Sequence, residues 1–162
     1  MLGQPLLFAI LGTAAIILGA RCAVSLGTTP STLQTLAVVL VAGIWGPWVG
    51  AVAVLLYAAC AWAGLPVLSF GSAIPFPRFI HSASFGWVLG FLPAALLTGA
   101  ARRWAGARLG PWFAVALAAH IVAIAVGLAW NRGGVELTVL LGALAKSAIA
   151  AVTLALLRGR MR

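Results

Sequence analysis

The residue best placed to do chemistry in this sequence is Lys146, near the middle of the apolar segment 135–157. An ammonium at the centre of a bilayer costs roughly 2.5–3.5 kcal/mol on insertion scales, so something must offset it. The single acid, Glu136, lies about 15 Å away along a helix and cannot pair with Lys146 there. We therefore expect a bound carboxylate as counter-charge, with a snorkelling or neutral lysine as the alternative.

The run Gly142–Ser147 superficially resembles a phosphate loop. That motif needs a glycine directly before the lysine and another five positions ahead of it, where this chain has Ala145 and Leu140. The sequence predicts no nucleotide site. Any ATP-driven step would therefore need another polypeptide.

Further polar and aromatic residues open two other apolar segments. Thr32, Gln34 and Thr35 stand at the start of segment 31–45, where a positive helix end could face an acidic ligand. Ser84 and Trp87 open segment 84–104 and could line the same cavity, with Trp87 as a flat apolar wall. The alternatives are hydrogen bonds between helices for the polar groups and an interfacial belt position for the tryptophan.

Two other residue types suggest no reaction. His81 and His120 have no Asp to orient them and no nucleophile-elbow context, which argues against an intramembrane hydrolase. Cys22 and Cys60 lack the paired spacing of zinc or redox sites, and we expect inert core thiols. The sequence predicts a non-enzyme without cofactor or metal.

Composition identifies the elements that must position Lys146. Of the 162 residues, 64% are hydrophobic and 7% charged, a balance that excludes a water-soluble fold. A bilayer core takes helices of roughly 20 apolar residues, so we predict an all-α membrane domain of about six transmembrane helices, 1–162. The six segments are 6–26, 31–45, 47–63, 84–104, 109–130 and 135–157.

Proline and glycine mark the helix ends and one unusual connection. Pro30 and Pro47 suit the first turns of the second and third helices, which are short. The connection 65–82 is rich in proline and yet strongly apolar. Irregular backbone at membrane depth needs protein or a water-filled cavity around it, so we predict a lid over a cavity, with a loop resting on headgroups as the alternative.

Charge sets the expected orientation and partners. The chain has ten Lys and Arg residues but only one acidic residue. Most basic groups must therefore interact with lipid headgroups, water or an anionic ligand. They do not form the basic stripe that nucleic-acid binding needs. Six arginines fall on the side that carries both termini and three on the other, which predicts cytoplasmic termini in the cytoplasmic membrane.

The first segment carries small residues at helical spacing. Ala9 with Thr13, and Ala15 with Gly19, are four residues apart. Such a face admits another helix closely, from a partner or from the same chain. No Lys or Arg precedes this segment, so we expect a retained helix rather than a cleaved signal.

Several short motifs together resemble one known family, the BioY proteins, which are biotin-specific substrate-capture (S) components of energy-coupling factor transporters. The similarity is strong over 28–91 and rests beyond that on Lys146 and the helix pattern. The motifs are Thr28-Thr29-Pro30-Ser31-Thr32-Leu33-Gln34-Thr35-Leu36-Ala37-Val38, Gly46-Pro47, Gly50, Tyr57, Gly64-Leu65-Pro66-Val67 and Gly86-Trp87-Val88-Leu89-Gly90-Phe91.

The resemblance implies a six-helix S component that binds biotin from outside and joins a membrane coupling protein and ATPase subunits. It also implies that Ala15 and Gly19 lie on the docking face for the coupling protein. Two positions depart from the family pattern: Ala143 stands where an Asp is usual, and 83–87 replaces Pro-Thr-Gly-Gly-Tyr. A related S component for another small carboxylate, such as a lipoate-like molecule or a biotin precursor, and a membrane scaffold without ligand are the alternatives.

Overall fold

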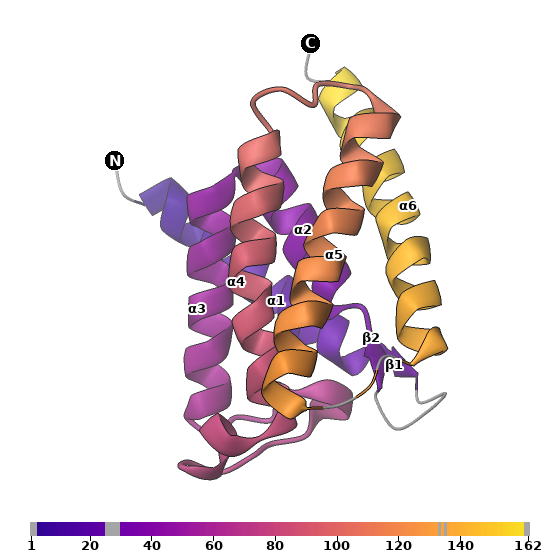
Figure 1. Cartoon of the computed structure of the whole chain (residues 1–162). Helices are drawn as coiled ribbons and strands as arrows, with labels where there is room; N and C mark the ends of the chain where they lie inside the picture. The colour runs from indigo at the N-terminus through magenta and orange to yellow at the C-terminus, as the bar shows by residue number, and fades with distance from the viewer. Residues whose placement is uncertain (1–2, 25–29, 133, 135, 161–162) are drawn as a thin grey trace.

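Six α-helices make up most of the protein in the computed structural model, as the apolar segments predict (Figure 1). The structure describes residues 3–24, 30–132, 134 and 136–160. Its elements, in chain order, are α1 (Gly3–Arg21), β1 (Ala23–Val24), β2 (Ser31–Thr32), α2 (Gln34–Trp45), α3 (Pro47–Trp62), the 3-10 helices η1 (Ser69–Gly71) and η2 (Arg78–His81), α4 (Ala83–Ala101), α5 (Leu109–Asn131) and α6 (Leu137–Arg160).

Helix length separates the six into two groups. The helices α1, α4, α5 and α6 have 19 to 24 residues and are long and apolar enough to cross a membrane. At 12 and 16 residues, α2 and α3 are shorter, as predicted, and α2 spans only about 18 Å. Large apolar side chains such as Leu18, Trp48 and Leu156 are exposed on the outer faces, which suits a lipid surround. The protein is a multi-pass membrane protein.

The start of the second helix differs from the prediction. Ser31 and Thr32 are not its first residues but form β2, which pairs antiparallel with β1 through Ala23 opposite Thr32. Pro30 therefore does not occupy a first helical turn, and the first helix ends at Arg21 instead of near position 26. Backbone pairing between the two short strands replaces the helical hydrogen bonds here. The prediction for Pro47 is confirmed, since it begins α3 directly after Gly46, whose φ is 105°.

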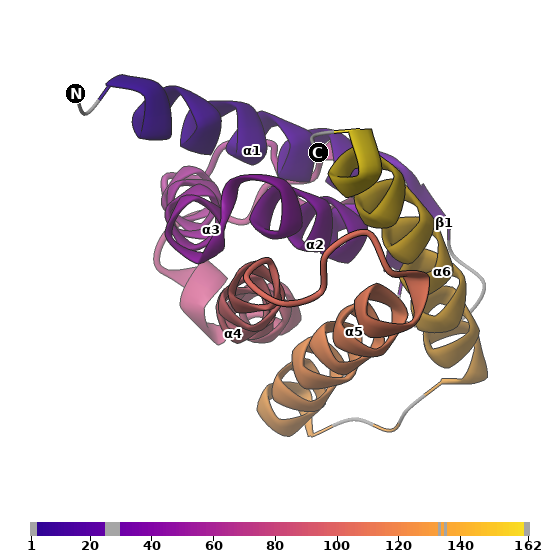
Figure 2. The same cartoon turned by 90° about the horizontal axis from the view of Figure 1, so that it is seen from above.

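Helix α2 is the centre of the bundle. It packs against each of the other five helices, and the view from above shows α1, α3, α4 and α6 arranged around it (Figure 2). Glycines allow close approaches elsewhere in the bundle: Gly90 on α4 faces the backbone of Ala123 on α5, and Gly99 faces Pro47 at the start of α3. Membrane helices lack a hydrophobic force between them, so they associate through such close packing.

Two arginines donate hydrogen bonds to the carboxyl end of α2. At the end that carries the C-terminus, Arg102 Nη1 donates to Trp45 O at 3.3 Å and Arg158 Nη2 donates to Gly43 O at 3.0 Å. Both carbonyls belong to the last turn of α2, where unpaired carbonyls and the negative end of the helix favour a cation.

Candidate functional site

A pocket of about 250 Å³ lies among the helices beside β2 and the loop that follows α3. Its walls come from β2, from the loop that follows α3 and from the helices α2 to α6. The lining residues are Pro30, Ser31, Thr32, Gln34, Thr35, Tyr57, Leu68, Ser69, Ala83, Ser84, Trp87, Val88, Phe91, His120, Ile124, Asn131, Val139, Ala143 and Lys146.

All five residues predicted to bind substrate line this one pocket: Lys146, Gln34, Ser84, Trp87 and Ala143. They come from α2, α4 and α6, which are far apart in the sequence. Their convergence supports the predicted substrate site. The role of each residue in binding stays a prediction.

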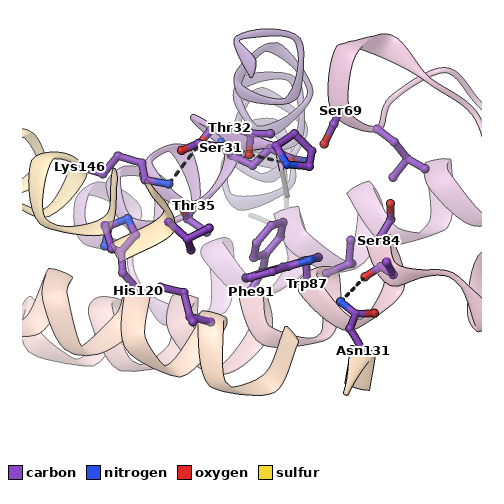
Figure 3. Close-up of a pocket in the computed structure, with 18 of the residues that line it drawn as sticks. Ser31, Thr32, Thr35, Ser69, Ser84, Trp87, Phe91, His120, Asn131 and Lys146 are labelled. Atoms are coloured by element: carbon purple, nitrogen blue, oxygen red, sulfur yellow. Dashed lines mark hydrogen bonds between the residues drawn. The ribbon is translucent and has the colours of Figure 1, made fainter. Parts of the chain in front are cut away.

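Lys146 extends from α6 toward β2, as Figure 3 shows. Its Nζ donates a hydrogen bond to the backbone oxygen of Thr32 at 3.1 Å. This oxygen is within reach because the pairing of β1 with β2 holds Thr32 over the pocket. An ammonium has three donors, so two remain for other groups, and within the described residues no carboxylate forms an ion pair with Lys146.

Gln34 is 6% exposed and is held at both ends of its amide. Its Nε2 donates to the Tyr57 hydroxyl at 2.6 Å, and Thr32 Oγ1 donates to its Oε1 at 3.0 Å. The Tyr57 hydroxyl in turn donates to Val67 O at 3.2 Å. This chain of hydrogen bonds ties β2, α2, α3 and the connecting loop into one wall, so Gln34 both bonds a neighbouring helix and lines the pocket.

The opposite wall comes from α4 and α5. Ser82 caps the start of α4 by accepting a bond from Phe85 N at 3.3 Å, which orients the first turn that carries Ser84 and Trp87. The Trp87 ring lies against Gly127 of α5, where a Cβ would come within 2.6 Å of Cε3. Only glycine leaves room for the indole, so Trp87 is a pocket wall here rather than solely a belt residue.

The connection predicted as a lid contributes part of the pocket wall. Leu68 and Ser69 line it, and Val67, Leu68 and Phe79 are buried against the bundle. Arg21 Nη2 donates to Pro66 O at 3.3 Å and so fastens this loop to the end of α1. Opening of the loop stays a prediction.

Sequence reasoning missed His120, Phe91 and Asn131 as pocket residues. The sequence argues against a hydrolase role for His120, but a histidine inside an apolar helix is itself a signal for a polar site. Asn131 stood at the predicted end of α5, and in the structure its Nδ2 donates to Ala83 O at 3.3 Å (Figure 3).

Some predicted residues lie outside the pocket. Gly19 is buried, and a Cβ there would lie 2.9 Å from the backbone of Leu33, so packing within the chain already explains its small size. Ala15 is half-buried against the core, and its docking role stays a prediction. Cys22 is exposed, which contradicts a core thiol, because α1 ends before it; Cys60 is half-buried.

Comparison with known proteins agrees with this geometry. The biotin transporter BioY of Rhodobacter capsulatus is 42% identical over 85 residues, which are 52% of this chain and 44% of that protein. Biotin transporter BioY2 of Lactococcus lactis subsp. cremoris is 31% identical over 126 residues, 75% of this chain and 66% of that protein. The matches thus span between about half and two thirds of these relatives.

The fold has a counterpart among solved structures. The crystal structure of the S-component for biotin from an ECF-type ABC transporter superposes with a TM-score of 0.74 at 24% identity, and covers 98% of this chain and 90% of that one. The predicted S-component-like bundle is confirmed. The model of the BioY family matches residues 3–161, so this chain belongs to the BioY family.

Proposed function

We propose that this protein binds biotin in the pocket and brings it across the membrane as the substrate-capture subunit of an energy-coupling factor transporter. Family membership and two relatives named as biotin transporters support this function. The observation that carries it is a pocket among the helices with the ammonium of Lys146 at one side and the flat ring of Trp87 at another.

The chemistry of the pocket suits a small acid with an apolar body. Pockets for drug-sized ligands measure roughly 300–1,000 Å³, and this pocket of about 250 Å³ is slightly smaller, which suits a small molecule. Lys146 supplies charge-assisted hydrogen bonds for a carboxylate, while Trp87 and Phe91 supply apolar area. Gln34 and Ser84 add neutral polar contacts.

Energy for transport comes, in this proposal, from other polypeptides. The lysine of α6 lies inside a helix instead of following a glycine loop, so the chain relies on ATPase subunits joined through a membrane coupling protein. The exposed side of α1 near Ala15 is the proposed docking face. The loop 65–82 would open to admit biotin and close again over it.

The proposed orientation places both termini in the cytoplasm and the loop 65–82 outside. Arg102 and Arg158 lie at one end of the bundle and Arg21 at the other, in agreement with the six-to-three arginine asymmetry. Reporter fusions at the C-terminus test this topology. An external C-terminus would overturn both the orientation and the outward-facing loop.

The substrate is tested by calorimetric titration of the purified chain with biotin and with lipoate. The proposal expects saturable biotin binding at one site per chain and weaker binding of lipoate. Absence of biotin binding by a folded sample would refute the proposed function. Tighter binding of lipoate would assign the pocket to another small carboxylate, which the replacement at Ala143 makes the second candidate.

A further inference from the structure

Two hydrogen-bonding atoms of the pocket residues are buried and have no partner among the residues that the structure describes: Nε2 of His120 and Oγ1 of Thr35. Both residues line the pocket, and His120 is 1% exposed. Buried polar atoms in native proteins are nearly always hydrogen-bonded. Unpaired atoms at the wall of a ligand-sized pocket therefore point to groups on a bound molecule.

The other ring nitrogen of His120 defines which kind of group is missing. Nδ1 lies 2.7 Å from Ala116 O, and a carbonyl oxygen can only accept, so Nδ1 carries the proton. Ser147 Oγ, which donates to Ala143 O at 2.7 Å, lies 3.1 Å from the same nitrogen. The tautomer is thus set by contacts to α5 and α6.

The surroundings also indicate the charge of the ring. His120 lies on the same side of the pocket as the Lys146 side chain (Figure 3). A second positive charge beside a buried ammonium is unfavourable, so the imidazole is neutral. Its Nε2 then presents a lone pair, which needs a hydrogen-bond donor.

We propose that His120 is a ligand-binding residue whose Nε2 accepts a hydrogen bond from an N–H group of the bound molecule. With Lys146 as a donor and His120 as an acceptor, the pocket selects acids that also carry an N–H. The inference rests on the proposed function and refines it. Biotin and desthiobiotin have a carboxylate and the N–H groups of a cyclic urea, whereas lipoate has a carboxylate and no N–H.

Two substitutions test the roles of Nδ1 and Nε2 of His120 separately. In His120→Asn the side-chain amide can still donate to Ala116 O but does not reach the position of Nε2. In His120→Gln the longer amide can present its oxygen there. The purified full-length variants are titrated with biotin, desthiobiotin and lipoate, and their thermal unfolding is followed to confirm a native fold.

The expected result is a loss of about tenfold in affinity for biotin and for desthiobiotin in His120→Asn, with much of it regained in His120→Gln. Lipoate, measured in competition with biotin, should respond to neither change. Unchanged biotin affinity in His120→Asn would overturn the inference and assign the Nε2 partner to water. An equal loss for all three ligands would overturn it in favour of a structural role, and failure of the unsubstituted protein to bind biotin would overturn the proposed function as well.

Discussion

Replacement of Lys146 by alanine tests the central element of the site. The substitution removes an ammonium that, within the described chain, is engaged only by the carbonyl oxygen of Thr32 at 3.1 Å. Two of its three donors remain for a ligand. A charge-assisted hydrogen bond contributes about 1.5–3 kcal/mol, so we expect biotin affinity to fall roughly tenfold to hundredfold, or further if both donors bind it.

Stability should respond differently from binding in Lys146→Ala. The bond to Thr32 is lost, but so is the cost of a lysine near the bilayer centre, roughly 2.5–3.5 kcal/mol. The two effects offset one another. We therefore expect an unfolding midpoint in detergent that is unchanged or higher than that of the unsubstituted protein.

The assay is calorimetric titration of purified protein with biotin, with thermal unfolding on the same samples. Thr153→Ala is the matched control, because Thr153 is on the same helix, is half-buried and does not line the pocket, and its hydroxyl donates to Ile149 O within its own helix. Lys146→Arg should recover binding in part at most, since a guanidinium is larger and planar. If Lys146→Ala binds biotin as tightly as Thr153→Ala does, Lys146 is a snorkelling residue and the anion-site reasoning fails.

Three further substitutions probe the walls of the pocket. Trp87→Ala removes a large apolar contact and should weaken biotin binding roughly tenfold or more in the same titration; unchanged affinity would return the residue to an interfacial role. Gly90→Ile places a Cβ 2.7 Å from Ala123 O, and should destabilise the protein by about 1–3 kcal/mol in thermal unfolding, whereas an unaltered midpoint would mean that α4 and α5 can separate freely. Arg21→Ala loses the bond to Pro66 O and should raise the biotin dissociation rate about twofold in stopped-flow measurements; equal rates would argue against a fastened lid.

Much of the site could be predicted from the sequence, because its key residues are charged, polar or aromatic side chains within or at the start of apolar segments. Lys146 stands out in any membrane helix, since its charge needs a partner. Gln34, Ser84 and Trp87 stand out because they open helices beside irregular segments. All of these residues line the pocket.

The polar ring of His120 in an apolar helix is also visible in the sequence, but its role as a hydrogen-bond acceptor could not be predicted from it. Its part in the site depends on which of its nitrogens is already bonded, and that follows from Ala116 one turn earlier and Ser147 on another helix. The role of Thr32 is likewise set by strand pairing with Ala23. Contacts of this kind join residues that are distant in the chain, so a local sequence pattern cannot predict them.

The class of this protein follows from its amino-acid sequence: the composition demands a membrane, the segment lengths predict the helices, and a lysine within an apolar segment calls for an anion. Hydrophobic periodicity and charge are properties of a single segment, and they do not depend on what that segment packs against. Three features became known only from the packing of the helices: Gly19 contacts the backbone of Leu33, α2 is central, and His120 lines the same pocket as Lys146. The physical reason is that these outcomes depend on which helix faces fit together, and close packing is a property of pairs of helices rather than of either one.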